Sequence, residues 1–237
     1  GADEAGLDPR PQAAGVLRRA LALSSVAARA GLEARADEDE ARGLHPRMLD
    51  WLRDTGLERD LEPAELELVA APLGALDPAA ALDAGWRAEG AYVMAWALGR
   101  CGPLPHDRLV DPHDVAWPLG FLEADALARE DEAELRGERE IDTFLARQLA
   151  VHWRLREYAQ RPGPMDFASV VANGGWARLD IDDAALADGD LAIDGGPIDR
   201  AEPARIERCT SIACERHRAA SWLAGSGPLY SNAGTAT

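Results

Sequence analysis

The chain contains no lysine: all 25 of its basic residues are arginine. Genomic base composition is the simplest cause of this bias. Whatever its cause, the absence excludes a P-loop lysine and Schiff-base chemistry, because both require a lysine ε-amine. The sequence also has no HExxH, ExxH, GxGxxG or GxSxG motif. It therefore lacks the common signatures of zincins, di-iron proteins, Rossmann folds and α/β-hydrolases.

Aromatic residues are scarce: three Phe and three Tyr stand beside seven Trp in a chain of 237 residues. Hydrophobic residues nevertheless make up 47% of the chain, and most of them are Ala and Leu. This mixture favours helices over a β-sandwich or barrel, which would need more β-branched and aromatic residues. The three cysteines show no framework spacing, so we expect reduced thiols.

Negative charge dominates, with a formal net charge of −17 at pH 7. This charge argues against a nucleic-acid partner, which needs a basic face, and no apolar run is long enough to span a bilayer. We expect a cytoplasmic protein that has no cofactor and binds neither nucleic acid nor membrane; a basic protein partner would suit its charge. The chain begins at Gly1 rather than at methionine, which leaves open a removed signal peptide.

Hydrophobic spacing predicts helices over residues 12–32, 48–53, 63–71, 77–99, 138–158 and 202–223. Asp77 can cap the fourth of these, with Pro78 at its first helical position. The stretch "LPHDRLVDPHDVAWPLG" (104–120) carries prolines too often for a long helix and is expected to be a loop with a short turn. The stretch "LAIDGGPI" (191–198) predicts a hairpin that turns at residues 194–196.

These elements predict a mainly α fold, a single-domain helical bundle-like array with a small β-hairpin near residues 190–199. The domain is expected to cover residues 10–237. Residues 1–9 are expected to be frayed, and the Gly- and Ser-bearing tail from about 226 to 237 to be flexible.

The last helix carries an arginine inside its apolar stripe. On a helical wheel, Arg216 falls between Cys209 and Leu223, whereas Glu215 and Arg218 point the other way and are expected to face solvent. A buried charge without a partner costs several kcal/mol, so Arg216 requires a carboxylate.

Two other predicted helices carry polar residues in the same manner. Glu89 lies in the stripe formed by Leu82, Trp86, Val93 and Trp96. Gln148 and His152 lie in the stripe of the 138–158 helix. Glu89 is the leading candidate to pair with Arg216, and Gln148 and His152 could complete the hydrogen bonds. We therefore predict a buried polar network of Glu89, Gln148, His152 and Arg216.

Two interpretations of this network compete. In the first, it is a closed structural network that fixes how three helices meet. In the second, it lines the cleft of a hydrolase-like enzyme, with Glu89 or His152 as general base and Arg216 as the group that binds an anion. An open pocket beside Glu89 would favour the second interpretation.

Other polar residues give weaker signals. His106, Asp107, His113 and Asp114 have the side chains of metal ligands but not the spacing, and a polar loop is the better interpretation. Asp188, Asp190 and Asp194 resemble a calcium loop only loosely, since the later glutamate is missing. Cys214 and His217 form a pair without further ligands, so a helix surface is expected there. We predict no metal site.

Four segments also match a known pattern: "AGWRAEGAYVMAWALG" (84–99), "LRGEREIDTFLARQLAVHWRLRE" (135–157), "DGDLAIDGGPI" (188–198) and "SIACERHRAASWLAG" (211–225). They resemble the bacterial family called domain of unknown function 4272. The matching residues are Trp86 and Glu89, His152 and Trp153, and Glu215, Arg216, Ala219, Trp222 and Leu223. Ser221 stands where the family has asparagine. The resemblance implies a mostly helical single domain and carries no assigned activity.

The sequence thus favours a non-enzymatic interaction or scaffold-type domain of unknown role. Such a domain should present an acidic or an apolar surface patch. The alternative is the hydrolase-like enzyme that uses Glu89 and His152, with Arg216 as anion binder.

A first prediction concerns the carboxylate of Glu89. The substitution Glu89→Gln should leave Arg216 without its predicted counter-charge and lower the free energy of unfolding by ~2–4 kcal/mol. Thermal or urea unfolding measures this change. An unchanged unfolding curve would mean that Glu89 is exposed or paired elsewhere.

Overall fold

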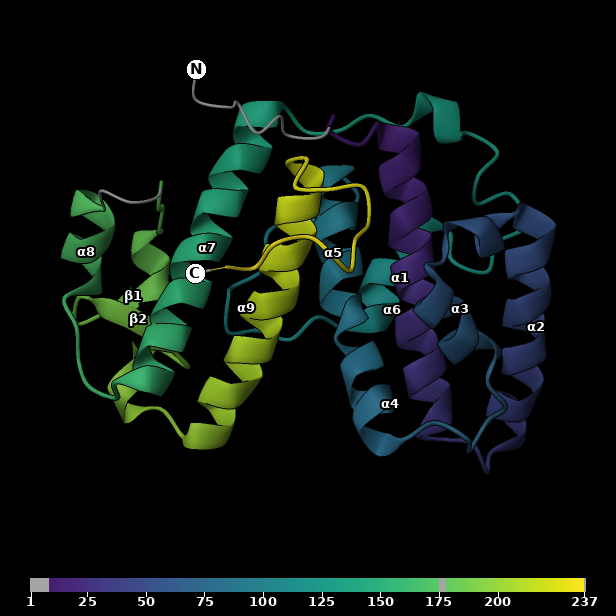
Figure 1. Cartoon of the computed structure of the whole chain (residues 1–237), viewed down its shortest axis with the longest axis horizontal. Helices are drawn as coiled ribbons and strands as arrows, with labels where there is room; N and C mark the ends of the chain where they lie inside the picture. The colour runs from purple at the N-terminus through teal and green to yellow at the C-terminus, as the bar shows by residue number, and fades with distance from the viewer. Residues whose placement is uncertain (1–8, 175–177, 237) are drawn as a thin grey trace, which may run out of the picture. The chain divides into compact units, whose positions relative to one another are not determined.

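The computed structural model describes residues 9–174 and 178–236 (Figure 1). Two compact units make up the chain. We call residues 11–102 and 110–136 the N-terminal unit. The C-terminal unit consists of residues 137–236, the segment 103–109 and the residues before Pro11. The mainly α fold with a small hairpin is confirmed, whereas the single domain expected over residues 10–237 stays a prediction.

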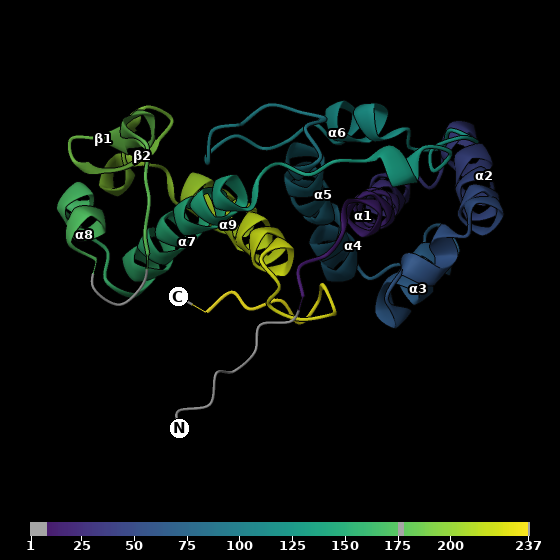
Figure 2. The ribbon, with the colours of Figure 1, turned by 90° about the horizontal axis from the view of Figure 1, so that it is seen from above.

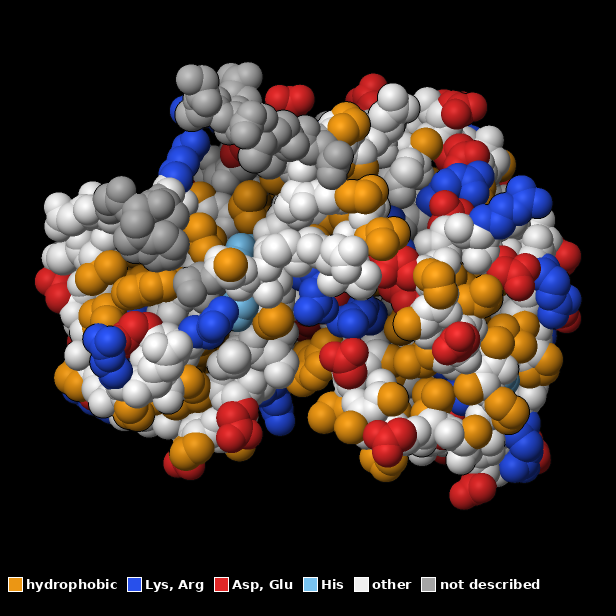
Figure 3. All heavy atoms as spheres, viewed as in Figure 1, with side chains coloured by type: hydrophobic (Ala, Val, Ile, Leu, Met, Phe, Trp, Pro, Cys, Tyr) orange, Lys and Arg blue, Asp and Glu red, His pale blue; other side chains and the backbone are white. Residues whose placement is uncertain are grey.

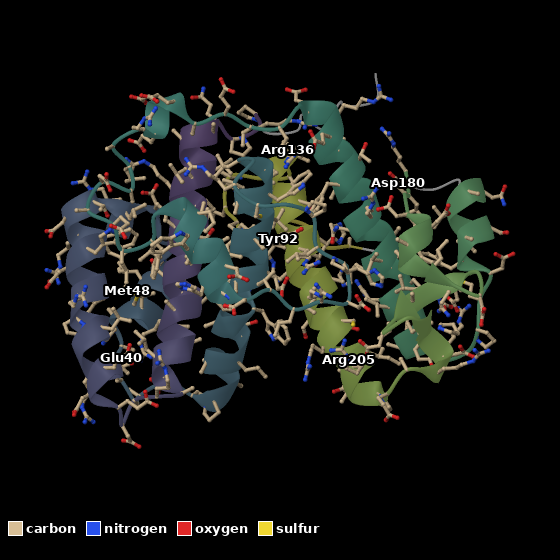
Figure 4. All side chains as sticks on the ribbon, turned by 180° about the vertical axis from the view of Figure 1, so that it is seen from behind. Glu40, Met48, Tyr92, Arg136, Asp180 and Arg205 are labelled. Atoms are coloured by element: carbon tan, nitrogen blue, oxygen red, sulfur yellow. The ribbon has the colours of Figure 1, made fainter. Side chains whose placement is uncertain are left out.

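The N-terminal unit is entirely helical in its described residues. Its helices are α1 (Ala13–Glu33), α2 (Asp39–Thr55), α3 (Pro63–Ala70), α4 (Pro78–Gly85), α5 (Arg87–Ala97) and α6 (Pro112–Leu119), with short 3₁₀ turns at Leu57–Asp60 and Glu130–Glu132. Helix α1 is central: it packs along α5 and also contacts α2, α3, α4 and α6 (Figure 2). Met48 of α2 and Tyr92 of α5, labelled in Figure 4, are both buried in the core.

A buried arginine ties α1 to the loop that follows α3. Arg29 has no exposed surface, and its Nη2 donates to the carbonyl oxygens of Ala71 (3.0 Å) and Pro72 (2.8 Å). Its Nη1 donates to Glu33 at 2.7 Å, and the Glu33 carboxylate in turn accepts the backbone N–H groups of Gly74 and Leu76. This pair therefore supplies the hydrogen bonds that a loop without secondary structure needs.

The helix predicted over residues 77–99 is two helices in the structure. Asp77 caps α4 as predicted, because its Oδ1 accepts the N–H groups of Ala79 and Ala80. The chain then breaks at Trp86, where α4 ends and α5 begins. The break changes the phase of the wheel, so the predicted burial of Leu82 is wrong: its side chain is 66% exposed. Figure 3 shows hydrophobic side chains among charged ones on the face that carries α3 and α4, as on many protein surfaces.

Two other segments are more helical than predicted. Helix α2 begins at Asp39, within the acidic stretch, rather than near residue 48, and it ends as predicted at Gly56, whose φ is 75°. Residues 112–119 form the helix α6 rather than a loop with a short turn. Pro112 is compatible with the helix, because it occupies the first turn, where no N–H is needed. Pro118 lies inside the helix and removes one backbone hydrogen bond, and the helix ends one residue later at Leu119. Asp111 caps α6 by accepting the N–H of His113.

The C-terminal unit combines two long helices with a small sheet. Its elements are α7 (Glu138–Gln160), α8 (Phe167–Asn173), β1 (Leu186–Ala187), β2 (Asp190–Ile193), β3 (Gly196–Pro197) and α9 (Pro203–Leu223), with 3₁₀ turns at Asp183–Ala185 and Ile198–Arg200. Helices α7 and α9 pack side by side (Figure 1). Leu155 of α7, Phe167 of α8 and Leu191 and Ile193 of β2 form its hydrophobic core together with Cys209 of α9.

The predicted hairpin is confirmed, and a second turn of the same kind precedes it. Strands β2 and β3 pair antiparallel across Asp194 and Gly195, whose φ angles are 52° and 81°. Strands β1 and β2 pair across Asp188 and Gly189, whose φ angles are likewise 52° and 81°. Positive φ at both turn residues is the type I′ geometry that Asp-Gly favours.

A buried ion pair attaches the sheet to α7. Arg154 donates from Nε and Nη2 to the two carboxylate oxygens of Asp190, at 2.8 Å each, and both side chains are buried. Arg154 Nη2 also donates to the carbonyl oxygen of Gly163. Asp190 accepts the N–H groups of Met165 and Leu191. Burial acts to raise the pKa of Asp190, but the hydrogen bonds from Arg154 and the backbone outweigh it and lower that pKa.

Of residues 1–9, expected to be frayed, only Pro9 lies among the described residues. In the tail expected to be flexible, Tyr230 is buried and donates to Glu215 from its hydroxyl at 2.7 Å. Within the described residues, no helix is both long and apolar enough to cross a membrane.

The substitution Asp190→Asn should destabilise the C-terminal unit by about 3 kcal/mol, because it removes the buried charge that pairs with Nε and Nη2 of Arg154 and leaves that guanidinium, among the carboxylates of the described residues, only the contact of its Nη1 with Glu157 at 3.2 Å. Urea unfolding at pH 7 measures the change. The matched control is Asp188→Asn, which alters an exposed Asp188–Arg200 pair two residues away and should cost less than about 1 kcal/mol. Equal losses of unfolding free energy in the two variants would contradict the conclusion that the Arg154–Asp190 pair is buried.

Candidate functional site

Arg216 is held by a loop of its own unit. It lies in α9, and its side chain is 1% exposed. Its Nη1 donates to the carbonyl oxygen of Pro105 at 2.9 Å, and its Nη2 donates to that of Arg108 at 2.7 Å. A guanidinium in this position orders the segment 103–109, which has no helix or strand.

Glu89 lies in the first turn of α5 and is 1% exposed. Its Oε1 accepts the backbone N–H of Val110 at 2.9 Å, within the N-terminal unit. The carboxylate thereby fixes the chain just before α6. Glu89 and Arg216 belong to different units, and the ion pair expected between them stays a prediction.

His152 has a partner that the sequence analysis did not assign to it. Its Nδ1 lies 3.0 Å from Nδ1 of His217, and both rings are buried between α7 and α9. The two rings are nearly perpendicular, at 77°. Because a hydrogen bond needs one donor and one acceptor, one ring must carry its proton on Nδ1 and the other on Nε2. The expectation that His217 lies on a helix surface is wrong.

Both histidines are held neutral at pH 7. Burial, together with smaller contributions from the neighbouring His217, Arg156 and Arg218, lowers the pKa of His152 to about 4. Burial also lowers the pKa of His217 to about 4. Protonation of either ring would convert its Nδ1 acceptor into a donor or place a cation in the core.

Gln148 lies one turn before His152 on α7 and is also buried. Among the described residues, its Oε1 has no hydrogen-bond partner. The structure thus joins His152 to His217 and Arg216 to a loop, and it gives Gln148 no observed role in either. The four-residue network stays a prediction.

Glu215 is a further polar residue that the sequence analysis misplaced. It was expected to face solvent, yet it is 2% exposed. Its Oε1 accepts the hydroxyl of Tyr230, and its Oε2 accepts Nη1 of Arg218 at 2.6 Å. The wheel gives the direction of a side chain but not what covers it, and here the tail beyond α9 covers it. The one sequence signal that could have indicated its importance is that Glu215, with Arg216, belongs to the family pattern.

Two of the residues considered as possible metal ligands make hydrogen bonds to the hairpin instead. His106 Nε2 hydrogen-bonds to the carbonyl oxygen of Ala192, and Asp107 accepts the N–H of Asp194. These two contacts join the segment 103–109 to the hairpin. His113 and Asp114 are exposed on α6. Within the described part of the chain, no three His, Cys, Asp or Glu side chains are grouped so as to hold a metal ion.

The outer face of α6 presents the most exposed large hydrophobic side chain of the described residues. Trp117 is 72% exposed, and its ring lies 6.2 Å from that of His113 between centroids. Two surface hollows border it. One is lined by His113, Asp114, Trp117 and Pro118, and the other includes Trp117, Pro118, Arg100, Glu123, Asp125, Arg129 and Glu132. We call this surface the Trp117 surface.

Comparison with known families assigns the chain. The family model described as Domain of unknown function (DUF4272) matches residues 4–174, more than half of the chain. The chain belongs to this family. No curated protein and no solved structure matches it.

The DUF4272 match covers some of the candidate residues and leaves others outside it. It ends after α8, so it includes Glu89, Gln148, His152 and the whole Trp117 surface. Arg216 and His217 lie beyond it, in α9. The buried histidine pair of this DUF4272 protein therefore joins a residue inside the match to one outside it.

The histidine pair predicts an acid-sensitive C-terminal unit. An unfolded histidine has a pKa near 6.5, so between pH 6.5 and about 4 the unfolded chain binds protons that the folded chain does not. The contribution of the pair to stability is therefore complete above pH 6.5 and should fall by on the order of 3 kcal/mol for each histidine as the pH is lowered through this window. Urea unfolding at pH 7.0, 6.0, 5.0 and 4.5 measures it.

The variant His217→Gln removes one of the two titrating groups and should lose roughly half as much stability over the same window. The control His113→Gln changes an exposed histidine, leaves the pair intact and should show the full loss. A flat profile between pH 7 and 5 in the unmodified protein would contradict burial of the pair.

Proposed function

We propose that the protein is a non-enzymatic interaction domain that binds a basic protein segment on the Trp117 surface. The observation that carries the proposal is the 72% exposure of Trp117. An exposed tryptophan loses hydration favourably on binding, and tryptophan is enriched among the residues that dominate interface energies. Its position between two hollows gives a partner side chain places to insert.

Charge around Trp117 specifies the kind of partner. The hollows contain the carboxylates of Asp114, Glu123, Asp125 and Glu132. Of their two arginines, Arg129 donates to Glu132 and Arg100 donates to the carbonyl oxygen of Pro118. The remaining negative charge suits arginine or lysine, and an arginine can also stack on the indole ring. The net charge of −17 would accelerate the approach of such a partner.

Burial supports this function over the hydrolase-like alternative. Glu89, His152 and Arg216 are each no more than 3% exposed. Each also has an internal hydrogen-bond partner: the Val110 N–H, the His217 ring and the loop carbonyl groups. A general base must come within hydrogen-bond distance of its substrate, and side chains as deeply buried as these do not reach one without rearrangement.

The test uses a 15-residue peptide of alternating arginine and leucine, with a glutamate-for-arginine peptide as its control. Isothermal titration should show binding of the basic peptide that weakens between 50 and 500 mM salt. Trp117→Ala should weaken this binding about thirtyfold, as loss of a central aromatic contact does.

The matched control is Leu82→Ala, which removes another exposed hydrophobic side chain of the same unit and should bind as the unmodified protein does. Salt-independent binding, or equal binding by the Trp117 and Leu82 variants, would contradict the proposal, because each would place the contact elsewhere.

A further inference from the structure

An apolar pocket lies inside the N-terminal unit, on the inner side of α6. Its volume is about 290 Å³. Its lining comes from α1, α2, α5 and α6 and from the residues just beyond α1 and α6. Most of the lining side chains are hydrocarbon, among them Leu32, Leu44, Val115 and Phe121. It is separate from the outer Trp117 surface, and the inference below does not depend on the proposed function.

Small residues create the pocket. Ser24, Ala27, Ala28 and Gly31 follow one another at helical spacing along α1, and Ala88 and Ala91 line it from α5. Such short side chains leave the space beside these helices unfilled. The one hydroxyl among them, that of Ser24, donates to the carbonyl oxygen of Ala20 at 2.8 Å. The walls thus offer few hydrogen bonds to water, and an apolar cavity of this kind favours a hydrocarbon occupant.

One permanent positive charge, that of Arg35, lies among the lining residues of the pocket. Arg35 and His113 both line the pocket and are exposed. The Arg35 guanidinium lies 3.8 Å from Glu38 and 3.9 Å from Glu40, beyond hydrogen-bond distance. It can therefore turn its donors toward an anion at the mouth, and a guanidinium binds a carboxylate with two parallel hydrogen bonds. A hydrophobic pocket with one exposed guanidinium among its lining residues matches an alkyl chain that ends in a negative group.

We propose that this pocket binds a medium-chain alkyl carboxylate, with the chain among the alanines of α1 and α5 and the carboxylate on Arg35. The size follows from the volume. An apolar cavity of 150 Å³ holds benzene, with six carbons. A pocket of about 290 Å³ is about twice as large, and so fits a chain of roughly eight to ten carbons. No bond is made or broken in this binding.

The first experiment is isothermal titration of the whole protein with hexanoate, octanoate and decanoate at pH 7.5. Each added methylene that enters the pocket should tighten binding about fourfold. Decanol and decyltrimethylammonium carry the same chain without the carboxylate and should bind at least tenfold more weakly than decanoate. Affinity that does not depend on chain length, or equal affinity for the three head groups, would overturn the proposal.

Two variants locate the ligand. Gly31 lines the pocket, and a Cβ added there meets no atom within 4 Å; Gly31→Leu should therefore project into the open space and abolish decanoate binding. Gly15→Leu is the matched control. Gly15 is an exposed glycine of the same helix with the same free space, outside the lining, and its variant should bind normally. Both changes favour helix, and circular dichroism would verify the fold.

Arg35→Gln tests the contact with the carboxylate. It should weaken decanoate binding about tenfold while leaving decanol binding unchanged. Equal binding of decanoate by the Gly31 and Gly15 variants would contradict binding in this pocket. An Arg35→Gln variant that binds decanoate as tightly as the unmodified protein would contradict the contact between Arg35 and the carboxylate. If the protein sedimented with phosphatidylcholine vesicles and did not bind free decanoate, the proposal would be overturned, because the ligand would then be the acyl chain of a bilayer lipid.

Discussion

Three buried guanidinium groups hold the irregular parts of this structure on its helices. Arg29, Arg154 and Arg216 are the largest fully buried side chains among the described residues. Each projects from a long helix and donates to carbonyl oxygens of a segment that has neither helix nor strand: Ala71 and Pro72 for Arg29, Gly163 for Arg154, and Pro105 and Arg108 for Arg216. These segments contain or adjoin prolines, which provide no N–H for a backbone ladder. Their carbonyl groups need a donor from elsewhere, and the fixed fork of a guanidinium can serve two of them at once.

This arrangement accounts for polar residues on faces that should be apolar. A charge in the interior is costly unless it is fully hydrogen-bonded. Arg154 meets this requirement through Asp190 and Gly163, and Arg29 meets it through Glu33 and the loop after α3. The same principle explains the neutral histidine pair, in which the two buried Nδ1 atoms hydrogen-bond to each other without any charge. Interior polarity in these helices therefore has a structural use, and by itself it indicates no reaction.

The sequence predicted the features that depend on local pattern and missed those that depend on what covers a residue. The long helices, the Asp77 cap and the Asp194–Gly195 turn each follow from a few neighbouring residues, and each is confirmed. The partners of Arg216 could not be predicted, because a loop carbonyl group is present at every residue and leaves no signal in the sequence. His217 and Glu215 were placed at the surface for a related reason. A wheel gives direction only, and α7 and Tyr230 supply the cover. The break at Trp86 changed the wheel phase of one helix, and with it the position of Leu82.

The difference between the prediction from sequence and the structure bears most directly on the proposed binding surfaces at helix α6. Its prolines led to the prediction of a loop, although Pro112 occupies the first turn, where a helix tolerates proline, and Pro118 comes just before the helix ends. Its outer side carries Trp117, and its inner side carries Val115 and Ala116 in the wall of the apolar pocket. Glu89 adds to this arrangement, because its carboxylate accepts the Val110 N–H just before the helix begins. Glu89, the buried carboxylate that the sequence pattern indicated most clearly, thus positions α6, which carries both candidate binding surfaces. In this protein the buried charges hold the loops on the helices, and both proposed binding surfaces consist mainly of side chains that gave no signal in the sequence.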